Sequence, residues 1–255
     1  MLLQATNSRR KIAALAIAIL LVITLTGCGH KATGTASQRG NSSSPTTNTA
    51  SSGNQSIAAT AYPIQVSEIS QGSIKIQYPQ LTGMSDTAKQ ATINALIKKD
   101  IYDSSVGESL KLYPIDQISY NLSCRVTLNT TKILSIVYLG DAAITNGSSS
   151  KAVFGTTIDL GKATVMKLSD FVTVNTDFAG KVLQAPNWTY LDGQPKDGNL
   201  SAFIQDETSQ NLLTDIQSGD SAFYLTPRSL VVGVAIGNAL GDYALVDLPG
   251  QYATN

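Results

Sequence analysis

Apolar and polar positions divide the chain into three stretches. An almost unbroken apolar run extends from Ile12 to Leu25, directly after three basic residues at positions 9–11. From Gly29 to about Ala61 the chain is made mostly of Ser, Thr, Gly, Asn and Ala, with almost nothing apolar. Beyond this stretch, short apolar runs rich in Val, Ile and Tyr alternate with turn residues, which predicts a folded region dominated by strands.

Periodicity within the folded region predicts both strands and helices. Ser73–Tyr78 alternates as a half-buried strand that ends at Pro79. A helix capped by Ser85 or Asp86, with an acidic residue in its first turn, then runs to about Tyr102 with its isoleucines on one face. Further strands are predicted at Asp116–Val126, Thr131–Leu139, Ala152–Leu160, Ser229–Ile236 and Tyr243–Leu248.

The remaining segments complete an α+β prediction. A short helical turn is predicted at Leu168–Phe171, a helix at Asp177–Gln184, and one helix or two over Leu200–Ile216. Residues 188–199, with two Asp-Gly turns, are predicted to be a loop. Gly233 in the first strand of the last hairpin predicts a bulge or a close backbone approach. The expected fold is an antiparallel sheet packed by a few helices, in a single compact domain after a disordered tether.

The N-terminal apolar run has the length and flanks of an export signal. Its fourteen residues cover only ~21 Å of helix at ~1.5 Å each, short of the ~30 Å hydrocarbon core of a bilayer. A basic start, a short apolar core and small residues at the far end are typical of a secretory signal peptide, predicted here for residues 1–27. An uncleaved membrane anchor is the alternative.

The run ends in Leu25-Thr26-Gly27-Cys28, which resembles the lipobox of bacterial lipoproteins. The resemblance implies cleavage between Gly27 and Cys28 and diacylglycerol on the Cys28 thiol, with acyl chains such as palmitate. A thiolate is the best side-chain nucleophile for accepting a lipid, and two or more acyl chains anchor a protein stably. We therefore expect the protein at the cell membrane, lipid-anchored, with its folded part facing outside the cytoplasm.

Residues 28–61 are predicted to be a disordered tether. A segment with so little to bury cannot offset its ordering entropy, and some 32 residues of flexible chain span roughly 30 Å on average. His30 is the only histidine of the chain and lies in this stretch. We therefore do not expect it to act as a ligand or a base.

Charge and cysteine usage narrow the classes of partner. Three of the 18 basic residues and no acidic residue precede Cys28, which leaves 15 Lys and Arg against 18 Asp and Glu after cleavage. A mildly acidic chain argues against a nucleic-acid partner, because phosphate binding needs a basic stripe. With Cys28 committed to lipid, Cys124 has no partner for an internal disulfide and is expected to be a buried thiol.

Motifs that could carry chemistry have simpler structural explanations. A folded region without histidine excludes Ser-His, Cys-His and His-metal sites. The Ser-x-x-Lys match at Ser148–Lys151 lies in a polar loop, and the two other motifs of penicillin-binding proteins are missing. Asp192-Gly193 and Asp197-Gly198 fail the calcium-loop spacing and predict turns. The remaining candidates are the glycines 233, 237 and 241, which do not match a dinucleotide fingerprint, and Asp206 and Glu207, which are not a paired acid. No catalytic residue, metal site or cofactor is predicted, and we expect the protein not to be an enzyme.

Several short motifs resemble two families of extracytoplasmic domains. Ile76–Gly83, Ile93-Asn94 and Leu134–Ile136 resemble the domain that precedes the catalytic domain of PdaC-type peptidoglycan deacetylases. The matches to the second half of the lysozyme-sensing part of RsiV-type anti-sigma factors are Thr156–Lys162, Leu168–Phe171, Phe223–Pro227, Leu230–Val232 and Tyr243-Ala244. The resemblance implies a PdaC-like half at residues 62–150, an RsiV-like half at residues 151–255, and one α+β unit. Two departures are Thr145–Ser150, which lacks the histidine of the relatives, and Gly237–Gly241, which lacks their aromatic and proline residues.

These observations favour a binding or sensing module without chemistry of its own. The resemblance implies a cell-envelope partner, either a secreted protein such as lysozyme or peptidoglycan. Ten tyrosines fit a binding surface and equally fit the preference of strands for tyrosine. The alternatives are a passive structural envelope lipoprotein and a wall hydrolase that uses carboxylates alone.

Overall fold

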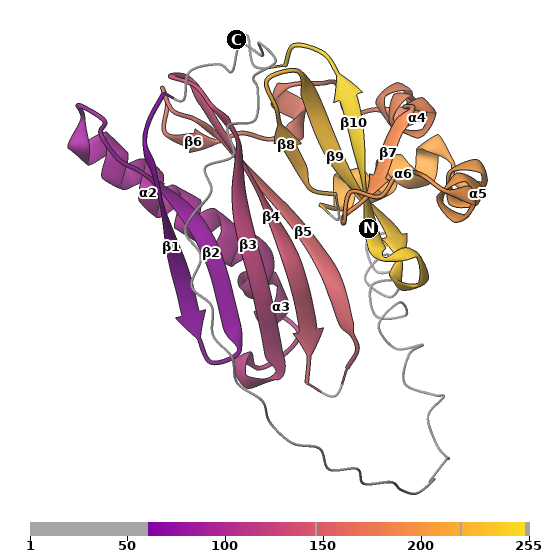
Figure 1. Ribbon diagram of the computed structural model, residues 1–255, viewed down its shortest axis with the longest axis horizontal. Coiled ribbons are helices and arrows are strands. Elements are labelled where there is room, and N and C mark those ends of the chain that lie inside the picture. The colour runs from indigo at the N-terminus through magenta and orange to yellow at the C-terminus, as the bar shows by residue number, and fades with distance from the viewer. Residues whose placement is uncertain (1–60, 146, 220, 253–255) are drawn as a thin grey trace, which may run out of the picture. The chain divides into compact units, whose positions relative to one another are not determined.

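Two β-sheets, each packed by helices, make up the computed structural model, which confirms the α+β prediction (Figure 1). The structure describes residues 61–145, 147–219 and 221–252. The predicted signal peptide, Cys28, His30 and the tether up to residue 60 lie outside the described residues. The six-stranded sheet has the order β1-β2-β3-β4-β5-β6, and the four-stranded sheet has the order β7-β10-β9-β8.

The six-stranded sheet is antiparallel except for one pair. Its strands are β1 (Ile64–Gln71), β2 (Ile74–Leu81), β3 (Ile118–Asn129), β4 (Ile133–Ile144), β5 (Ser149–Asp159) and β6 (Thr164–Val165). β2 and β3 pair in parallel, because the chain between them crosses over through α2 (Thr87–Tyr102), a π-helical turn (Asp103–Gly107), α3 (Glu108–Leu110) and a 3₁₀ turn (Ile115–Gln117). Parallel neighbours require such a crossover, which the expectation of an antiparallel sheet did not include.

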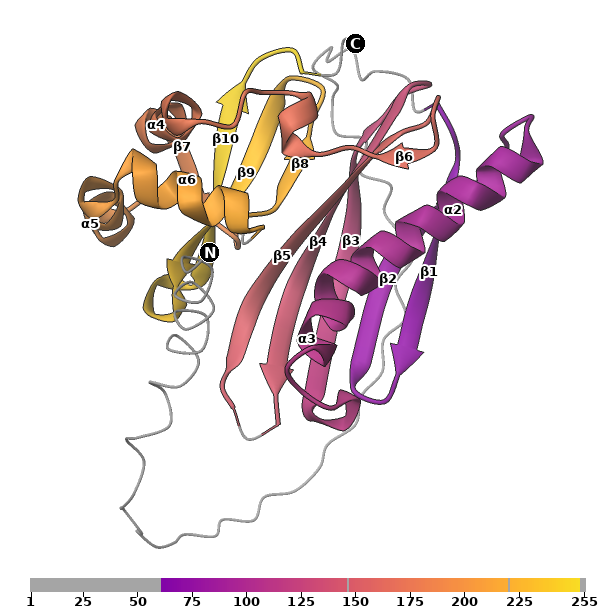
Figure 2. The ribbon, with the colours of Figure 1, turned by 180° about the vertical axis from the view of Figure 1, so that it is seen from behind.

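Helix α2 covers one face of this sheet (Figure 2). Ile93, Ile97 and Ile101 are fully buried, as the helical spacing predicted. Asp86 is the N-cap and accepts a hydrogen bond from the backbone N–H of Lys89 at 2.8 Å. The predicted acidic residue in the first turn is wrong, since the acid is the cap itself.

The start of the folded region differs from the prediction in two ways. β2 does not end at Pro79 but continues to Leu81. Within β2, only Ile74–Ile76 pair with β3. The sheet therefore does not need a backbone N–H from Pro79 on the β3 side. β1, which the pattern did not predict, is an edge strand whose Val66 remains 61% exposed.

The four-stranded sheet contains β7 (Asn187–Tyr190), β8 (Phe223–Leu225), β9 (Ser229–Gly237) and β10 (Asp242–Pro249). Its helices are α4 (Thr176–Gln184), α5 (Gly198–Asp206) and α6 (Ser209–Ser218), preceded by a 3₁₀ turn at Leu168–Asp170 and accompanied by another at Asn238–Leu240. The predicted β9–β10 hairpin is confirmed, and the predicted region of one or two helices contains two. Thr208 separates them, because its hydroxyl caps α6 by accepting from the backbone N–H of Asn211.

The predicted loop at residues 188–199 is wrong at its start. Trp188 lies in β7 and is 1% exposed, and its indole N–H donates to the carbonyl of Val182 at 3.1 Å. The Asp-Gly turns follow this short strand. A strand of four residues next to polar turns gives little periodicity, which is why the pattern alone did not reveal it.

The two sheets meet through β8, which lies against β4 and β5. A Cβ atom on Gly155 of β5 would lie 1.9 Å from the carbonyl oxygen of Phe223, so the backbones touch there. Beside this contact the backbone N–H of Leu225 donates to the hydroxyl of Ser135 at 2.9 Å. The described residues therefore belong to a single compact unit, and the predicted boundary between residues 150 and 151 falls inside β5.

Gly233 in β9 also lies at this junction. A Cβ atom there would lie 3.2 Å from a methyl group of Val153. The close approach predicted for Gly233 is confirmed, whereas the bulge of the hairpin lies between Asp242 and Tyr243.

Candidate functional site

Cys124 lies in β3 and has a free thiol. It is half-buried against the core beneath α2, opposite Tyr138 of β4 in the strand register. Burial raises the pKa of the Cys124 thiol, which disfavours the reactive thiolate. Its position agrees with the expectation of a small apolar side chain.

The Ser-x-x-Lys segment contains no nucleophile–base pair. Ser149 and Ser150 begin β5, and the ammonium group of Lys151 lies 2.7 Å from Asp141 on the neighbouring strand. The backbone N–H of Lys151 donates to Asp242 at 2.6 Å. Lys151 therefore joins neighbouring strands. The predicted polar loop is wrong from Ser149 onward, because β5 begins there.

The acidic residues of the two Asp-Gly turns shape the backbone. Asp192 accepts from the N–H of Gln194 at 3.0 Å, and Asp197 caps α5 by accepting from the N–H of Leu200 at 2.9 Å. That backbone hydrogen bond, together with the hydroxyl of Tyr190, lowers the pKa of Asp197. Asp192 therefore serves the predicted turn, whereas the turn predicted at Asp197-Gly198 is the start of α5.

The remaining motif residues also have structural positions. Gly237 and Gly241 have positive φ angles of 84° and 94° on either side of a 3₁₀ turn, where glycine is favoured. Asp206 ends α5, and Glu207 accepts from the N–H of Thr208 at 2.9 Å. Across the described part of the chain, no group of three or more His, Cys, Asp or Glu side chains could hold a metal ion.

A buried polar network lies under α2. The hydroxyl of Thr156 donates to Asp100 at 2.5 Å, and burial raises the pKa of Asp100. Tyr138 is fully buried beside them, and burial raises its pKa as well. The hydrogen bond between Thr156 and Asp100 therefore connects α2 to β5, with Tyr138 of β4 packed in the same core.

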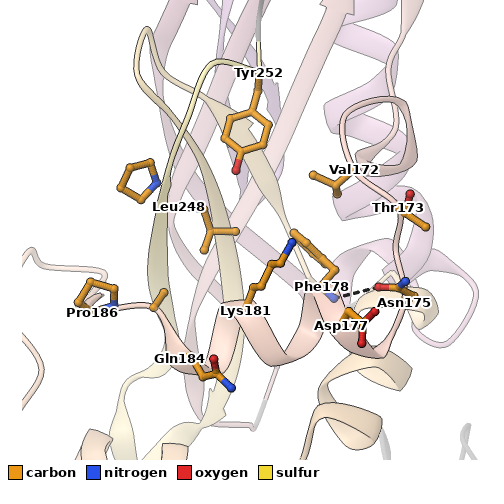
Figure 3. Close-up of a pocket in the computed structure, with 12 residues that line it drawn as sticks. Val172, Thr173, Asn175, Asp177, Phe178, Lys181, Gln184, Pro186, Leu248 and Tyr252 are labelled. Atoms are coloured by element: carbon orange, nitrogen blue, oxygen red, sulfur yellow. Dashed lines mark hydrogen bonds between the residues drawn. The ribbon is translucent and has the colours of Figure 1, made fainter.

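A hollow with a partly apolar lining runs along α4, and we call it the α4 groove (Figure 3). It has a volume of about 610 Å³ and is lined mainly by Val172, Phe178, Lys181, Pro186, Leu248 and Tyr252. In Figure 3, Lys181 extends between Leu248 on one side and Phe178 on the other, and Tyr252 lies above them.

Local sequence explains how these side chains come together. Asn175 caps α4 by accepting from the N–H of Phe178 at 2.9 Å, which fixes the first turn of the helix. Phe178 and Lys181 are three residues apart and share a face of α4, next to the end of β10 at Leu248. The lining combines apolar side chains with the charges of Lys181 and Asp177, which suits an extended peptide or another amphipathic ligand.

Sequence reasoning predicted α4 but not this groove. Its lining comes from the segment before α4, from α4 itself and from the chain after β10, which only the tertiary structure brings together. Phe178 and Lys181 at helical spacing were the one local signal. No described helix is both long enough and apolar enough to span a membrane.

Comparisons with known proteins give a structural likeness only. No family model matches the sequence, and no curated protein matches it. A DUF3298 family protein from Bacteroides fragilis matches with a TM-score of 0.44 and 10% identity, over 77% of this chain and 92% of that one. A DUF3298 family protein from Pseudomonas aeruginosa matches with a TM-score of 0.43 and 9% identity, over 74% and 90%.

Proposed function

We propose that the chain is a lipid-anchored envelope lipoprotein whose folded part is a non-catalytic binding or sensing module. Its partner is a secreted protein such as lysozyme, or peptidoglycan. The observation that carries the proposal is Leu25-Thr26-Gly27-Cys28 at the end of an apolar run too short to span a bilayer. Acylation of Cys28 would hold the folded part at the outer surface of the membrane, where such partners occur.

Two features support binding rather than catalysis. The only histidine, His30, precedes the folded part, so the common nucleophile–base pairs are not available there. The α4 groove has the size of a ligand pocket and combines apolar walls with Lys181. We assign it as the site that contacts the envelope partner.

Mass spectrometry of the membrane-extracted protein tests the anchor. The full chain is expressed with its own leader in a bacterial host, and its N-terminus is determined beside that of Cys28→Ala. We expect the native chain to begin at an acylated Cys28 and the variant to retain its leader. A native chain that starts at Met1, or that carries no acyl mass on Cys28, would refute the lipoprotein assignment.

Retention on immobilised lysozyme and on purified peptidoglycan tests the binding role. We expect retention on one of the two, reduced by Lys181→Gln and by Tyr252→Ala, while Lys98→Gln on the exposed side of α2 serves as the matched control. Retention on neither rejects the binding module in favour of a passive envelope protein. Release of soluble fragments from peptidoglycan, abolished by one Asp or Glu substitution, would instead establish a hydrolase.

A further inference from the structure

The helix-free face of the four-stranded sheet carries a row of four side chains, of which Val231 and Tyr224 also pack against the large sheet. The strand register places Asn187 beside Asp247, Asp247 beside Val231, and Val231 beside Tyr224. Their neighbours in sequence, such as Trp188 and Val246, point to the opposite face and into the core beneath the helices. The row lines a hollow of about 420 Å³, which we call the β10 hollow.

Asp247 lies at the centre of this hollow with an unsatisfied oxygen. Its Oδ1 atom is buried and has no hydrogen-bond partner among the described residues. A buried acceptor without a donor costs free energy, and a donor from a ligand removes that cost.

The surroundings of Asp247 are electrostatically mixed. Tyr224 is 5% exposed, and this burial is the main cause that raises its pKa. The Arg125 guanidinium from β3 lowers the pKa of Tyr224, while the Asp247 carboxylate raises it. A carboxylate, a phenol and a guanidinium from two different sheets therefore lie together at one end of the row.

A second guanidinium lies on the other side of the hollow. Arg228 is exposed in the β8–β9 turn and forms no ion pair with any residue that the structure describes. Among the hydrogen bonds that hold the turn, the N–H of Arg228 donates to the hydroxyl of Thr226 at 3.2 Å and the N–H of Gly250 donates to the carbonyl of Arg228 at 2.9 Å. The guanidinium thus projects from a fixed backbone.

The spacing of these charges defines the ligand. Arg228 is three residues before Val231, the neighbour of Asp247 in the register, so the two backbones are offset by about 10 Å along the strand. An extended dipeptide spans roughly 7 Å, so with one hydrogen bond at each end it covers an offset of this size. A guanidinium binds a carboxylate through two parallel hydrogen bonds, and an aspartate accepts from an ammonium group.

We propose that the β10 hollow binds an amino acid or short peptide, with its ammonium group on Asp247 and its free carboxylate on Arg228. Asn187 and Thr189 of β7 line the same hollow and offer further polar contacts to the peptide backbone. This site is separate from the α4 groove. It goes beyond the proposed function, because it requires neither the lipid anchor nor an envelope macromolecule.

Calorimetric titration of the full chain in detergent with the dipeptide Ala-Ala tests the site. N-acetyl-Ala-Ala lacks the ammonium group, Ala-Ala amide lacks the carboxylate, and N-acetylglucosamine is a neutral polar ligand. We expect Ala-Ala to bind and each blocked peptide to bind at least about tenfold more weakly, the loss that one charge-assisted contact implies.

Two variants assign the contacts. Arg228→Gln should weaken Ala-Ala and abolish the discrimination between the free carboxylate and the amide. Asp247→Asn should abolish the discrimination between the free and the acetylated amine. Lys98→Gln in α2 and Asp116→Asn in the 3₁₀ turn before β3, both at exposed positions, are the matched controls, and thermal unfolding confirms that each variant folds.

Several results would overturn the site. They are the absence of Ala-Ala binding at millimolar concentration, equal binding of the free and blocked peptides, and binding of N-acetylglucosamine alone. Unchanged affinity in both Arg228→Gln and Asp247→Asn would place the peptide elsewhere. None of these results depends on acylation of Cys28 or on retention by lysozyme or peptidoglycan, so the two proposals fail separately.

Discussion

The two sheets of the folded part use their second faces differently. The six-stranded sheet has α2 on one face, and β8 presses against the other so closely that Gly155 leaves no room for a side chain. The four-stranded sheet has three helices on one face, and its other face is only partly covered by the large sheet. The close backbone contact between Gly155 and Phe223 therefore stabilises the junction of the two sheets. Polar side chains, such as Asn187 and Asp247, lie on the same face of the small sheet and line the β10 hollow.

The largest expected effect is at the backbone contact itself. In Gly155→Ala the new Cβ atom would lie 1.9 Å from the carbonyl oxygen of Phe223, so the strands must separate. We expect a loss of roughly 3–5 kcal/mol in the free energy of unfolding, measured by urea denaturation. Gly198→Ala is the matched control, because nothing lies within 4 Å of its Cβ position at the start of α5. Equal stability of the two variants would show that the sheets do not depend on this contact.

The next effect concerns the polar contact beside it. Ser135 accepts from the backbone N–H of Leu225 at 2.9 Å and shares a hydrogen bond of 2.8 Å with Thr157. Ser135→Ala leaves that buried N–H without a partner, which costs about 1–3 kcal/mol. Hydrogen exchange at the Leu225 amide should accelerate in this variant. Ser123→Ala, on an exposed strand position, should change stability by less than about 0.5 kcal/mol.

A smaller effect, on the pH dependence of stability, is expected at Asp100 on the helix-covered face of the large sheet. Burial raises the pKa of Asp100, and the nearby Asp103 carboxylate raises it further, while the hydrogen bond from Thr156 and the charge of Lys99 lower it. Tyr138 and Cys124, on the strands beneath α2, both have raised pKa values, so they stay neutral at the acidic pH at which Asp100 titrates. A carboxyl with a raised pKa stabilises the fold fully below its unfolded value of 3.8, and that contribution is lost as pH rises through the folded value.

Asp100→Asn tests this linkage. The amide keeps an acceptor for Thr156 without a charge, so the stability of the variant should not fall over the same pH window. At neutral pH the variant should be at least as stable as the native chain, by urea denaturation at a series of pH values. Parallel pH profiles for the two proteins would contradict the assignment of the titration to Asp100.

The contrast between the sheets also explains what the sequence could predict. Ile93, Ile97 and Ile101 point to one core, so their spacing alone located α2. The β9–β10 hairpin was equally clear, because β9 buries an almost continuous apolar run and β10 buries alternate residues. Trp188 was placed in a loop because β7 is short and its partner β10 lies more than fifty residues away in sequence.

The candidate sites were largely beyond sequence reasoning. Asp247 and Arg228 have no distinctive motif around them, and their proximity follows from the register of three strands. The α4 groove likewise combines α4 with the end of β10. The proposed lipidation signal at Leu25–Cys28 is local in the sequence, because the enzymes that process such signals recognise a short segment rather than a fold.

The smallest expected effect is at Lys151, which touches both sheets in different ways. Its side chain forms an ion pair with Asp141 inside the large sheet, and its backbone N–H donates to Asp242 of the small one. Lys151→Met removes only the side-chain contact. Because both charged groups of the pair are about half exposed, we expect a loss below about 1 kcal/mol that vanishes at high salt. Asp242→Ala, which removes the acceptor that joins the two sheets, should cost more and should be insensitive to salt. If Lys151→Met cost as much as Asp242→Ala, the side chain rather than the backbone would be the connection between the sheets.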